Sequence, residues 1–466
     1  MNHPTGPYGH PLLGNLKDLR TRVLDFFSEL QKKYGDISTI RFSIRKVSYI
    51  QHPDYIHHVL QENNRNYTKS LRYEQLKYLL GNGLLTSEAE FWLRQRRMIQ
   101  PAFYKQKLQL LTEEMVSCTN EMMLNWEKDF QNKSFNFAAE MMALTLQIVG
   151  KTLLNADVKS DAKNVGDALS FLLKAVNIRT RTPVLLPMWV PVPTHLKITK
   201  AVKTINSVLD KIFETRRRTS SDHNDLLSML MEARYEDTGE PMGNKQLRDE
   251  VMTLFVAGHE TTANSLSWTM YLLSRHPEVM QKCVNEINQV LQNRLPAFSN
   301  IGELKYLTMV IEESMRLYPP AWIIGRKTIH HDAFGGYKFA PGHNVLISPY
   351  ALHRDPRYWP DPEKFLPERF LPDEIKKRPR NSYLPFGAGP RMCIGNNFAM
   401  MEMQLVISML LQKFRFTPAN NQPVIPEPLI TLRPLGGVWL KLQTINNTTD
   451  TKPHAVIQNN SNPAFN

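Results

Sequence analysis

The chain contains few cysteines. Its 466 residues include three, Cys118, Cys283 and Cys393, too few and too widely spaced for a disulfide framework or a C-x-x-C metal pair. Sparse cysteine is typical of proteins in a reducing cytosol. We therefore expect three free thiols and a cytoplasmic protein.

Long hydrophobic runs are also missing. No stretch of about 18 uninterrupted apolar residues occurs, which argues against a transmembrane helix. The N-terminus, Met1-Asn2-His3-Pro4, lacks the charged start and apolar stretch of a signal peptide. We therefore expect a soluble protein without a transmembrane anchor.

Basic side chains exceed acidic ones, and 57 Lys and Arg against 44 Asp and Glu give a net charge of +13. The basic clusters at 94–97, 216–218 and 376–380 are scattered and lack the interleaved aromatic residues of an RNA-binding sheet. Solvated faces are the simpler interpretation, so we expect no nucleic-acid partner. The charge balance suits an acidic protein partner better.

Hydrophobic periodicity predicts a mainly α fold. From Pro53 to about Pro320, apolar residues recur at three-and-four spacing, which is typical of amphipathic helices. Short strand-like runs fall in 37–51, 323–348 and 429–442, and the last of these is predicted to be a hairpin. No repeat or Gly/Ser linker divides the chain. We predict a single large domain over 1–443 with a smaller β-rich lobe, and a disordered tail over 444–466.

The segment 183–193 interrupts the helical pattern. Four prolines exclude a regular helix there, although the segment is strongly apolar. Two interpretations stay open, a packed loop and a mobile lid over an apolar pocket.

The stretch FGAGPRMCIG at 386–395 places one cysteine among three glycines. Glycines let the backbone approach a large flat ligand closely. A helical pattern follows Cys393 at once, and amide groups at a helix start favour a thiolate, as does the positive charge of Arg391. A thiolate held in this way is a good metal ligand, whereas Cys118 and Cys283 suit buried, inert thiols.

The stretch AGHETT at 257–262 lies midway along a long helical pattern. Gly258 costs about 1 kcal/mol relative to Ala inside a helix, so we expect a packing or functional reason for it, such as room for a flat ligand. Thr261 has an alternative interpretation, since a mid-helix Thr often bonds the carbonyl four residues back. His259 and Glu260 do not form a zinc motif, because position 263 is Ala where a second His is required.

Residues 386–395 match the haem-binding signature F-x-x-G-x-R-x-C-x-G of the cytochrome P-450 family at every fixed position. The chain resembles this family from its Pro- and Gly-rich lead-in to its last strands. The resemblance implies the cytochrome P-450 fold, a triangular helical body with a small sheet. It also implies haem b, with Cys393 as the iron ligand and with Phe386, Gly389 and Gly395 as contacts of the cofactor.

Residues 257–262 are similar to the family pattern [A/G]-G-x-[D/E]-T-[T/S]. This likeness implies an oxygen pocket at Ala257 and Gly258. It assigns Glu260 and Thr261 to the delivery of protons to bound oxygen.

Glu313-Ser314-Met315-Arg316 is similar to the family's E-x-x-R motif, and the segment 367–370 is similar to the one that completes its ion network. The resemblance makes Glu313, Arg316 and Arg369 structural residues that support the haem pocket.

The two haem propionates require cationic or hydrogen-bonding partners. The resemblance points to Trp92, Arg96, Arg326 and Arg391 for this role. It also points to His353, for which the alternative of a satisfied structural histidine stays open.

The resemblance implies a monooxygenase that inserts one oxygen atom from O₂ into a C–H bond of a small apolar substrate, with fatty acids as one candidate. No G-x-G-x-x-G fingerprint occurs. Electrons from NAD(P)H are therefore expected to arrive through a separate acidic ferredoxin or flavodoxin and its reductase. We expect a monomer. Two alternatives stay open: a relative that uses peroxide or needs no O₂, and a haem-thiolate sensor or electron carrier without turnover.

Overall fold

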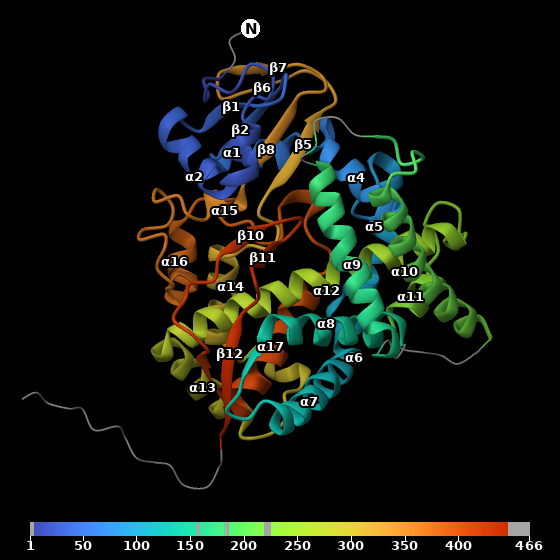
Figure 1. Cartoon of the computed structure of the whole chain (residues 1–466), viewed down its shortest axis with the longest axis vertical. Helices are drawn as coiled ribbons and strands as arrows, with labels where there is room; N and C mark the ends of the chain where they lie inside the picture. Colours follow the sequence, from blue (N-terminus) through green and yellow to red (C-terminus); the bar gives the residue numbers. More distant parts are fainter. Residues whose placement is uncertain (1–3, 156–158, 181, 183–185, 219–224, 446–466) are drawn as a thin grey trace, which may run out of the picture.

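The computed structural model describes residues 4–155, 159–180, 182, 186–218 and 225–445. Helices form most of the molecule, and a smaller sheet lobe lies at one end, toward the top of Figure 1. The mainly α architecture with a smaller β lobe is therefore confirmed.

The helices have the following bounds: α1 (Leu16–Thr21), α2 (Val23–Tyr34), α3 (Pro53–His57), α4 (Leu71–Leu80), α5 (Ala89–Ile99), α6 (Lys105–Leu110), α7 (Thr112–Asp129), α8 (Phe137–Leu154), α9 (Lys159–Thr180), α10 (Pro193–Arg218), α11 (Leu226–Glu232), α12 (Asn244–Arg275), α13 (Pro277–Leu291), α14 (Lys305–Leu317), α15 (Pro349–Leu352), α16 (Pro372–Lys377) and α17 (Asn396–Lys413). The strands have the following bounds: β1 (Ile37–Phe42), β2 (Arg45–Ile50), β3 (Tyr67–Lys69), β4 (Ser134–Asn136), β5 (Ile324–Thr328), β6 (Asp332–Phe334), β7 (Tyr337–Phe339), β8 (Asn344–Ile347), β9 (Phe414–Pro418), β10 (Pro426–Pro428), β11 (Leu432–Pro434) and β12 (Trp439–Thr444).

The larger sheet joins distant parts of the chain in the order β1-β2-β8-β5-β3. β2 runs parallel to β8, with Ile50 opposite Ile347, and both of these side chains are buried. β3 runs antiparallel to β5 and places Lys69 opposite Arg326. This register brings two cationic side chains from distant segments to the same edge of the sheet.

The segment 429–442 does not form the hairpin that the sequence suggested. β11 pairs with β10, whereas β12 pairs with β4 and β9 in a different sheet. β12 alternates exposed residues with Leu440 and Leu442, which are buried in the core. Burial of this face sets the partners of β12 more strongly than the nearby turn does.

α12 crosses the centre of the helical body (Figure 1) and is buried along most of its length. It packs against α8, α14 and α17. Two of its buried hydroxyl groups, those of Ser265 and Thr269, each donate to the carbonyl four residues back. α12 therefore gives residues 257–262 a rigid, enclosed support.

Among the described residues, α8 alone combines the length and the hydropathy of a membrane span. Within it, 61% of the residues are buried inside the protein. α8 packs against α12 and α7, as a core helix does.

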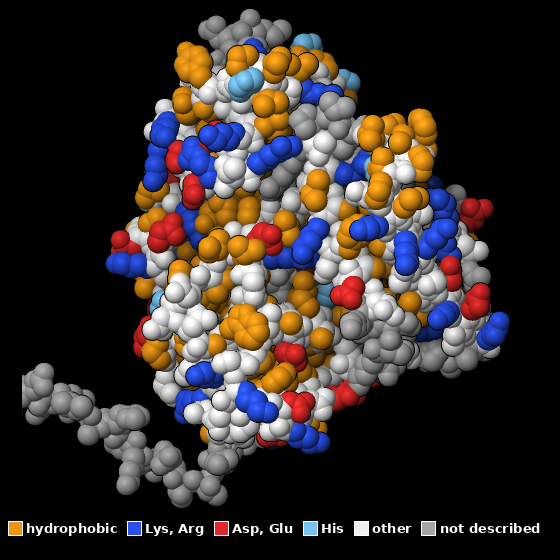
Figure 2. Space-filling model, in the orientation of Figure 1, with side chains coloured by type: hydrophobic (Ala, Val, Ile, Leu, Met, Phe, Trp, Pro, Cys, Tyr) orange, Lys and Arg blue, Asp and Glu red, His pale blue; other side chains and the backbone are white. Residues whose placement is uncertain are grey.

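Two expectations fall partly outside the described residues. In the apolar segment 183–193, residues 183–185 are not described. Further on, Met188 packs partly against the helices, while Leu186 and Trp189 are exposed by 52% and 82%. Figure 2 shows hydrophobic side chains at the surface in this part of the molecule, beside the end of α9. The lid stays a prediction. The tail expected to be disordered lies outside the described residues from 446 on.

Candidate active site

A cavity of about 1050 Å³ lies beside α12, and its walls come from the helical body, β5 and the loop before α17. Its lining is mainly apolar. Pockets of this kind bind small ligands when a few polar groups converge on an apolar wall. Two groups of polar residues in its lining matter here, one around Cys393 and one along α12.

Cys393 lies in the wall of this cavity, between a short helix at Gly389–Arg391 and the start of α17. Its backbone N–H donates to Phe386 O at 2.9 Å, and Arg96 donates to Met392 O at 2.9 Å. Burial raises the pKa of the Cys393 thiol, whereas the N–H of Gly395 and the charge of Arg96 lower it. Cys393 is the exposed cysteine of the three, and it lines the cavity.

Four cationic side chains line the cavity near this cysteine: Lys69, Arg96, Arg326 and Arg391. Arg391 forms an ion pair with Glu88 at 2.6 Å, and its guanidinium carbon lies 3.9 Å from the ring centroid of Trp92. Burial, together with the nearby charge of Arg326, lowers the pKa of Arg391 to about 10. The cluster has four cationic side chains, and the single carboxylate of Glu88 cannot neutralise all of them.

Lys69 belongs to the same cluster. Burial and the charge of Arg391 hold the pKa of Lys69 well below its usual range. Such crowded cations favour an anionic ligand, because its charge would offset their mutual repulsion.

On α12, residues Ala257, Gly258, Glu260 and Thr261 all line the cavity. The Thr261 hydroxyl donates to Ala257 O at 2.6 Å, which is the bond expected of a mid-helix threonine. A methyl group on Gly258 would lie 3.3 Å from Val149 of α8, so the glycine lets the two helices pack closely.

The Glu260 carboxylate is buried and turned toward β11. Its Oε1 accepts from Arg433 Nε at 2.5 Å and from the Thr431 hydroxyl. Thr431 also accepts from Asn264 Nδ2 at 3.1 Å, and Trp268 Nε1 donates to Leu432 O at 3.1 Å. Residues 260, 264 and 268 lie one above the other on one face of α12. Together they bind the three consecutive residues 431–433.

The residues present fit a haem. A thiol that lines the cavity beside a helix start, a cluster of cationic side chains and an apolar lining match an iron porphyrin with two propionates. Residues 4–440 match the family model for Cytochrome P450. The chain belongs to the cytochrome P450 family.

Relatives of this P450 cover most of its length. It is similar to cyclooctat-9-en-7-ol 5-monooxygenase of Streptomyces melanosporofaciens, with 34% identity over 89% of each chain. It is 32% identical to cyclooctatin synthase of the same organism, over 92% of this chain and 93% of the relative. It is also 32% identical to the chloroplastic protein Lutein deficient 5 of Arabidopsis thaliana, over 85% of this chain and 70% of the relative.

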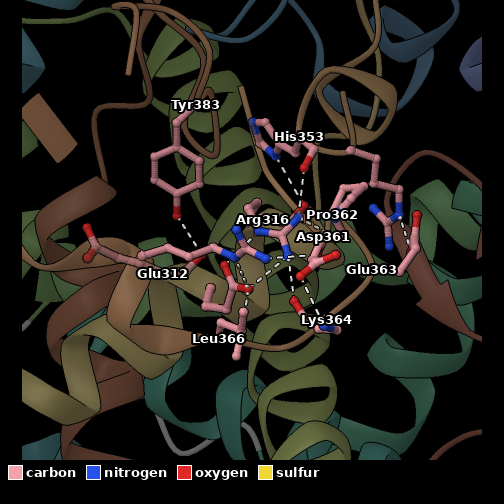
Figure 3. Close-up of polar contacts among 12 residues, drawn as sticks. Glu312, Arg316, His353, Asp361, Pro362, Glu363, Lys364, Leu366 and Tyr383 are labelled. Atoms are coloured by element: carbon pink, nitrogen blue, oxygen red, sulfur yellow. Dashed lines mark hydrogen bonds and ion pairs between the residues drawn. The ribbon is translucent and has the colours of Figure 1, made fainter. Parts of the chain in front are cut away.

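The E-x-x-R motif of this P450 forms a dry ion pair on α14. Glu313 and Arg316 are fully buried, and Arg316 donates to both carboxylate oxygens, at 2.6 and 2.8 Å. Arg369 Nε lies 3.4 Å from Glu313 Oε1. Figure 3 shows Arg316 surrounded by chain segments whose carbonyl groups it binds, those of His353, Pro362 and Lys364. These contacts tie α14 to the segment before the cysteine loop and lie away from the cavity lining.

His353 was expected either to contact the cofactor or to be a satisfied structural histidine, and its contacts are those of the second alternative. Its Nε2 accepts the Leu384 N–H at 2.8 Å, which leaves Nδ1 as the donor to Arg316 O at 3.2 Å. Burial holds the pKa of His353 well below its usual range, and the ring does not line the cavity. Both nitrogens are satisfied, so His353 is a structural histidine.

Gly389 was also expected to contact the cofactor, but it does not line the cavity. It has φ +70°, and a side chain there would overlap the carbonyl of Leu60. Glycine is required because the cysteine loop packs directly on the turn at His58–Glu62. Phe386 and Gly395 do line the cavity, as do Trp92, Arg96 and Arg326.

Two polar residues near the cavity escaped the sequence analysis. Lys69 lies in the short β3, which the helical pattern concealed, and only the register opposite Arg326 brings it to the cluster. Glu250 is fully buried on α12, seven residues before Ala257. One sign of Glu250 was present in the sequence: a charged residue stands at a position where the helical pattern predicts an apolar one.

Proposed function

We propose that this cytochrome P450 hydroxylates a bulky, mainly apolar molecule of the terpenoid class. The cavity supports the proposal, because its lining is mainly apolar. The names of two relatives support it as well, since they describe enzymes of cyclooctatin formation. The apolar lining away from the cysteine loop is the observation that carries the substrate class.

The haem would be held by Cys393 on one side and by Trp92, Arg96, Arg326 and Arg391 at its propionates. When bound, it supplies the activation of O₂ that hydroxylation of a C–H bond requires. The apolar lining contributes by orienting the substrate and excluding water.

Glu260 and Thr261 are proposed to deliver protons. The Thr261 hydroxyl lines the cavity, and its hydrogen bond to Ala257 O fixes its proton on the helix side. In the relay, the hydroxyl would turn from Ala257 O toward a ligand in the cavity to pass on its proton, and Glu260 would resupply it. A positioned acid–base group of this kind contributes typically about 10²–10⁴-fold to a rate.

A fatty acid is the second candidate substrate. Arg20 and Arg45 line the cavity and are exposed, so they lie at its mouth. A carboxylate at that end would meet positive charge while its chain filled the apolar interior.

Electrons are proposed to come from an acidic ferredoxin or flavodoxin, reduced by NAD(P)H through a reductase. Gly395 lies close to Phe103, in the turn at Gln100–Phe103 that joins α5 to α6, so this surface adjoins the cysteine loop. It exposes Arg97, Lys105 and Lys107, and a basic surface attracts an acidic partner.

The test begins with the CO complex of the reduced protein, which should show the red-shifted band of a thiolate-ligated haem, absent in Cys393→Ser. Terpenoid alcohols, long-chain fatty acids and small polar metabolites are then titrated separately and the haem spin state is recorded. The proposal predicts a shift with terpenoids; a shift with fatty acids alone supports the second candidate.

A normal CO spectrum with no shift from any ligand, and no O₂-dependent product, would favour a sensor or carrier. Product with peroxide alone would indicate the peroxide-using alternative.

A further inference from the structure

The loop Gly81–Leu85 connects α4 to the segment before α5 and forms part of the cavity wall. Leu84 and Leu85 both line the cavity. Loops of this kind tolerate movement unless their backbone groups are bound. In this loop, side chains from two separate elements bind the backbone.

α12 holds one side of the loop with two carboxylates. The Asn82 N–H donates to Asp249 Oδ2 at 2.9 Å, and the Leu84 N–H donates to Glu250 Oε2 at 2.7 Å. Gln246 completes the contact by donating to Asn82 O at 3.2 Å and to Glu250 Oε1 at 2.6 Å. Hydrogen bonds to charged acceptors are among the stronger ones in proteins.

The glycines of the loop allow this close approach. Gly81 has φ +61°, and a side chain there would overlap the carboxylate of Asp249. A side chain on Gly83 would overlap the hydroxyl of Thr253. The loop backbone therefore lies directly on α12, about two turns before the residues that line the oxygen side of the cavity.

β3 holds the other side of the loop. Lys69 Nζ donates to Leu85 O and, at 3.4 Å, to Leu84 O. The same ammonium group belongs to the cationic cluster of Arg391 and Arg326. The amide groups of Asn82 and Leu84 are thus bound by carboxyl groups, and the carbonyl groups of Leu84 and Leu85 by an ammonium group.

We propose that Asp249, Glu250 and Lys69 are positioning residues that fix the Gly81–Leu85 loop and so determine which substrate shapes this P450 accepts. The proposal deepens the proposed function, since it rests on substrate binding in this cavity. A fixed loop presents Leu84 and Leu85 as a preformed wall, and preformed sites discriminate shape without the cost of ordering a loop on binding.

Hydrogen–deuterium exchange of the haem-loaded protein tests the fixing of the loop. Glu250→Ala should speed exchange of the amides at residues 82–84 by at least about tenfold, because the Leu84 N–H loses its charged acceptor. Glu250→Gln keeps an acceptor oxygen, so its amide exchange rate should lie between those of the wild type and Glu250→Ala. Glu303→Gln, which changes an exposed carboxylate before α14, is the control and should match the wild type. Unchanged exchange in both Glu250 variants and in Asp249→Asn would overturn the proposal.

Ligand discrimination tests the consequence. Ligand affinities are measured from the shift in haem spin state. Glu250→Ala should reduce the difference in affinity between bulky and linear ligands, while haem content and the CO spectrum are retained. Leu84→Ala should alter the same difference without faster amide exchange. If neither variant changes this difference although the wild type binds ligands, the specificity role is wrong while the proposed function stands. If no ligand shifts the wild-type spin state, the proposed function fails, and the exchange result still tests the fixing of the loop.

Discussion

Arg433 Nε donates to Glu260 Oε1 over 2.5 Å, and this ion pair turns the Glu260 side chain toward β11. Both side chains are largely buried, with 12% and 3% exposure. A proton relay through Glu260 therefore involves a carboxylate that is already bound by a cation. Rotation toward Thr261 would break this contact, so Arg433 influences when Glu260 can take part.

Removal of the Thr261 hydroxyl should separate electron uptake from product formation. We expect Thr261→Ala to retain haem and substrate binding and to consume O₂, with more hydrogen peroxide and less product, because the relay loses its last donor. The measurement is the ratio of product to reductant oxidised, with peroxide assayed in parallel. Ser267→Ala is the matched control, since its hydroxyl makes the same kind of bond, to Ala263 O, one and a half turns further along. Wild-type coupling in Thr261→Ala would refute the relay assignment.

Arg433→Ala should impair both stability and coupling. It leaves the Glu260 carboxylate buried without its cation, which costs about 3–5 kcal/mol in comparable sites. Arg433→Lys keeps the charge and should recover part of both properties. Thermal unfolding and the product-to-reductant ratio are measured on the same preparations. An Arg433→Ala protein as stable and as well coupled as the wild type would show that the ion pair has no role.

The Glu313–Arg316 pair should be required for haem incorporation. Glu313→Ala strands a fully buried guanidinium, and we expect little haem-containing protein, with a loss of about 3–5 kcal/mol. Glu374→Ala is the control, because Glu374 pairs with Lys377 at the same spacing but in solvent, where such pairs contribute about 0–1 kcal/mol. The ratio of haem absorbance to protein reports the effect. Equal haem content in the two variants would contradict the prediction.

Glu250 should make stability depend on pH. Burial, reinforced by the charge of Asp249, raises its pKa from 4.5 to about 7. Between these two values the folded protein binds more protons than the unfolded chain, so the free energy of unfolding falls as the pH rises. Glu250→Gln lacks this proton, and its stability relative to the wild type should increase with pH across the window, by at most about 1.4 kcal/mol per unit. Unfolding midpoints of both proteins at several pH values within the window give the slope. Parallel curves would place the pKa of Glu250 near its ordinary value.

Sequence reasoning worked best where a motif is local. The cysteine loop and the 257–262 stretch of α12 could be placed because their spacing along the chain is also their spacing in space. For His353, the sequence could not show its partners, Leu384 and Arg316, because they come from other segments that no local pattern connects. The hairpin at 429–442 failed for the same reason, since burial of β12 in another sheet outweighed a favourable turn. Lys69 and Arg433 acquire their roles only through tertiary register.

The attachment of β11 to α12 has a consequence for the order in which the enzyme is made. Glu260 leaves the ribosome more than 150 residues before Thr431 and Arg433. Until then its carboxylate has neither of these partners, although the whole 257–262 motif has already been synthesised. Fragments that end before residue 431 would carry both the 257–262 motif and the cysteine loop and still lack the ion pair. The surroundings of Glu260, where the proton relay is proposed, are therefore among the last parts of the molecule to be completed.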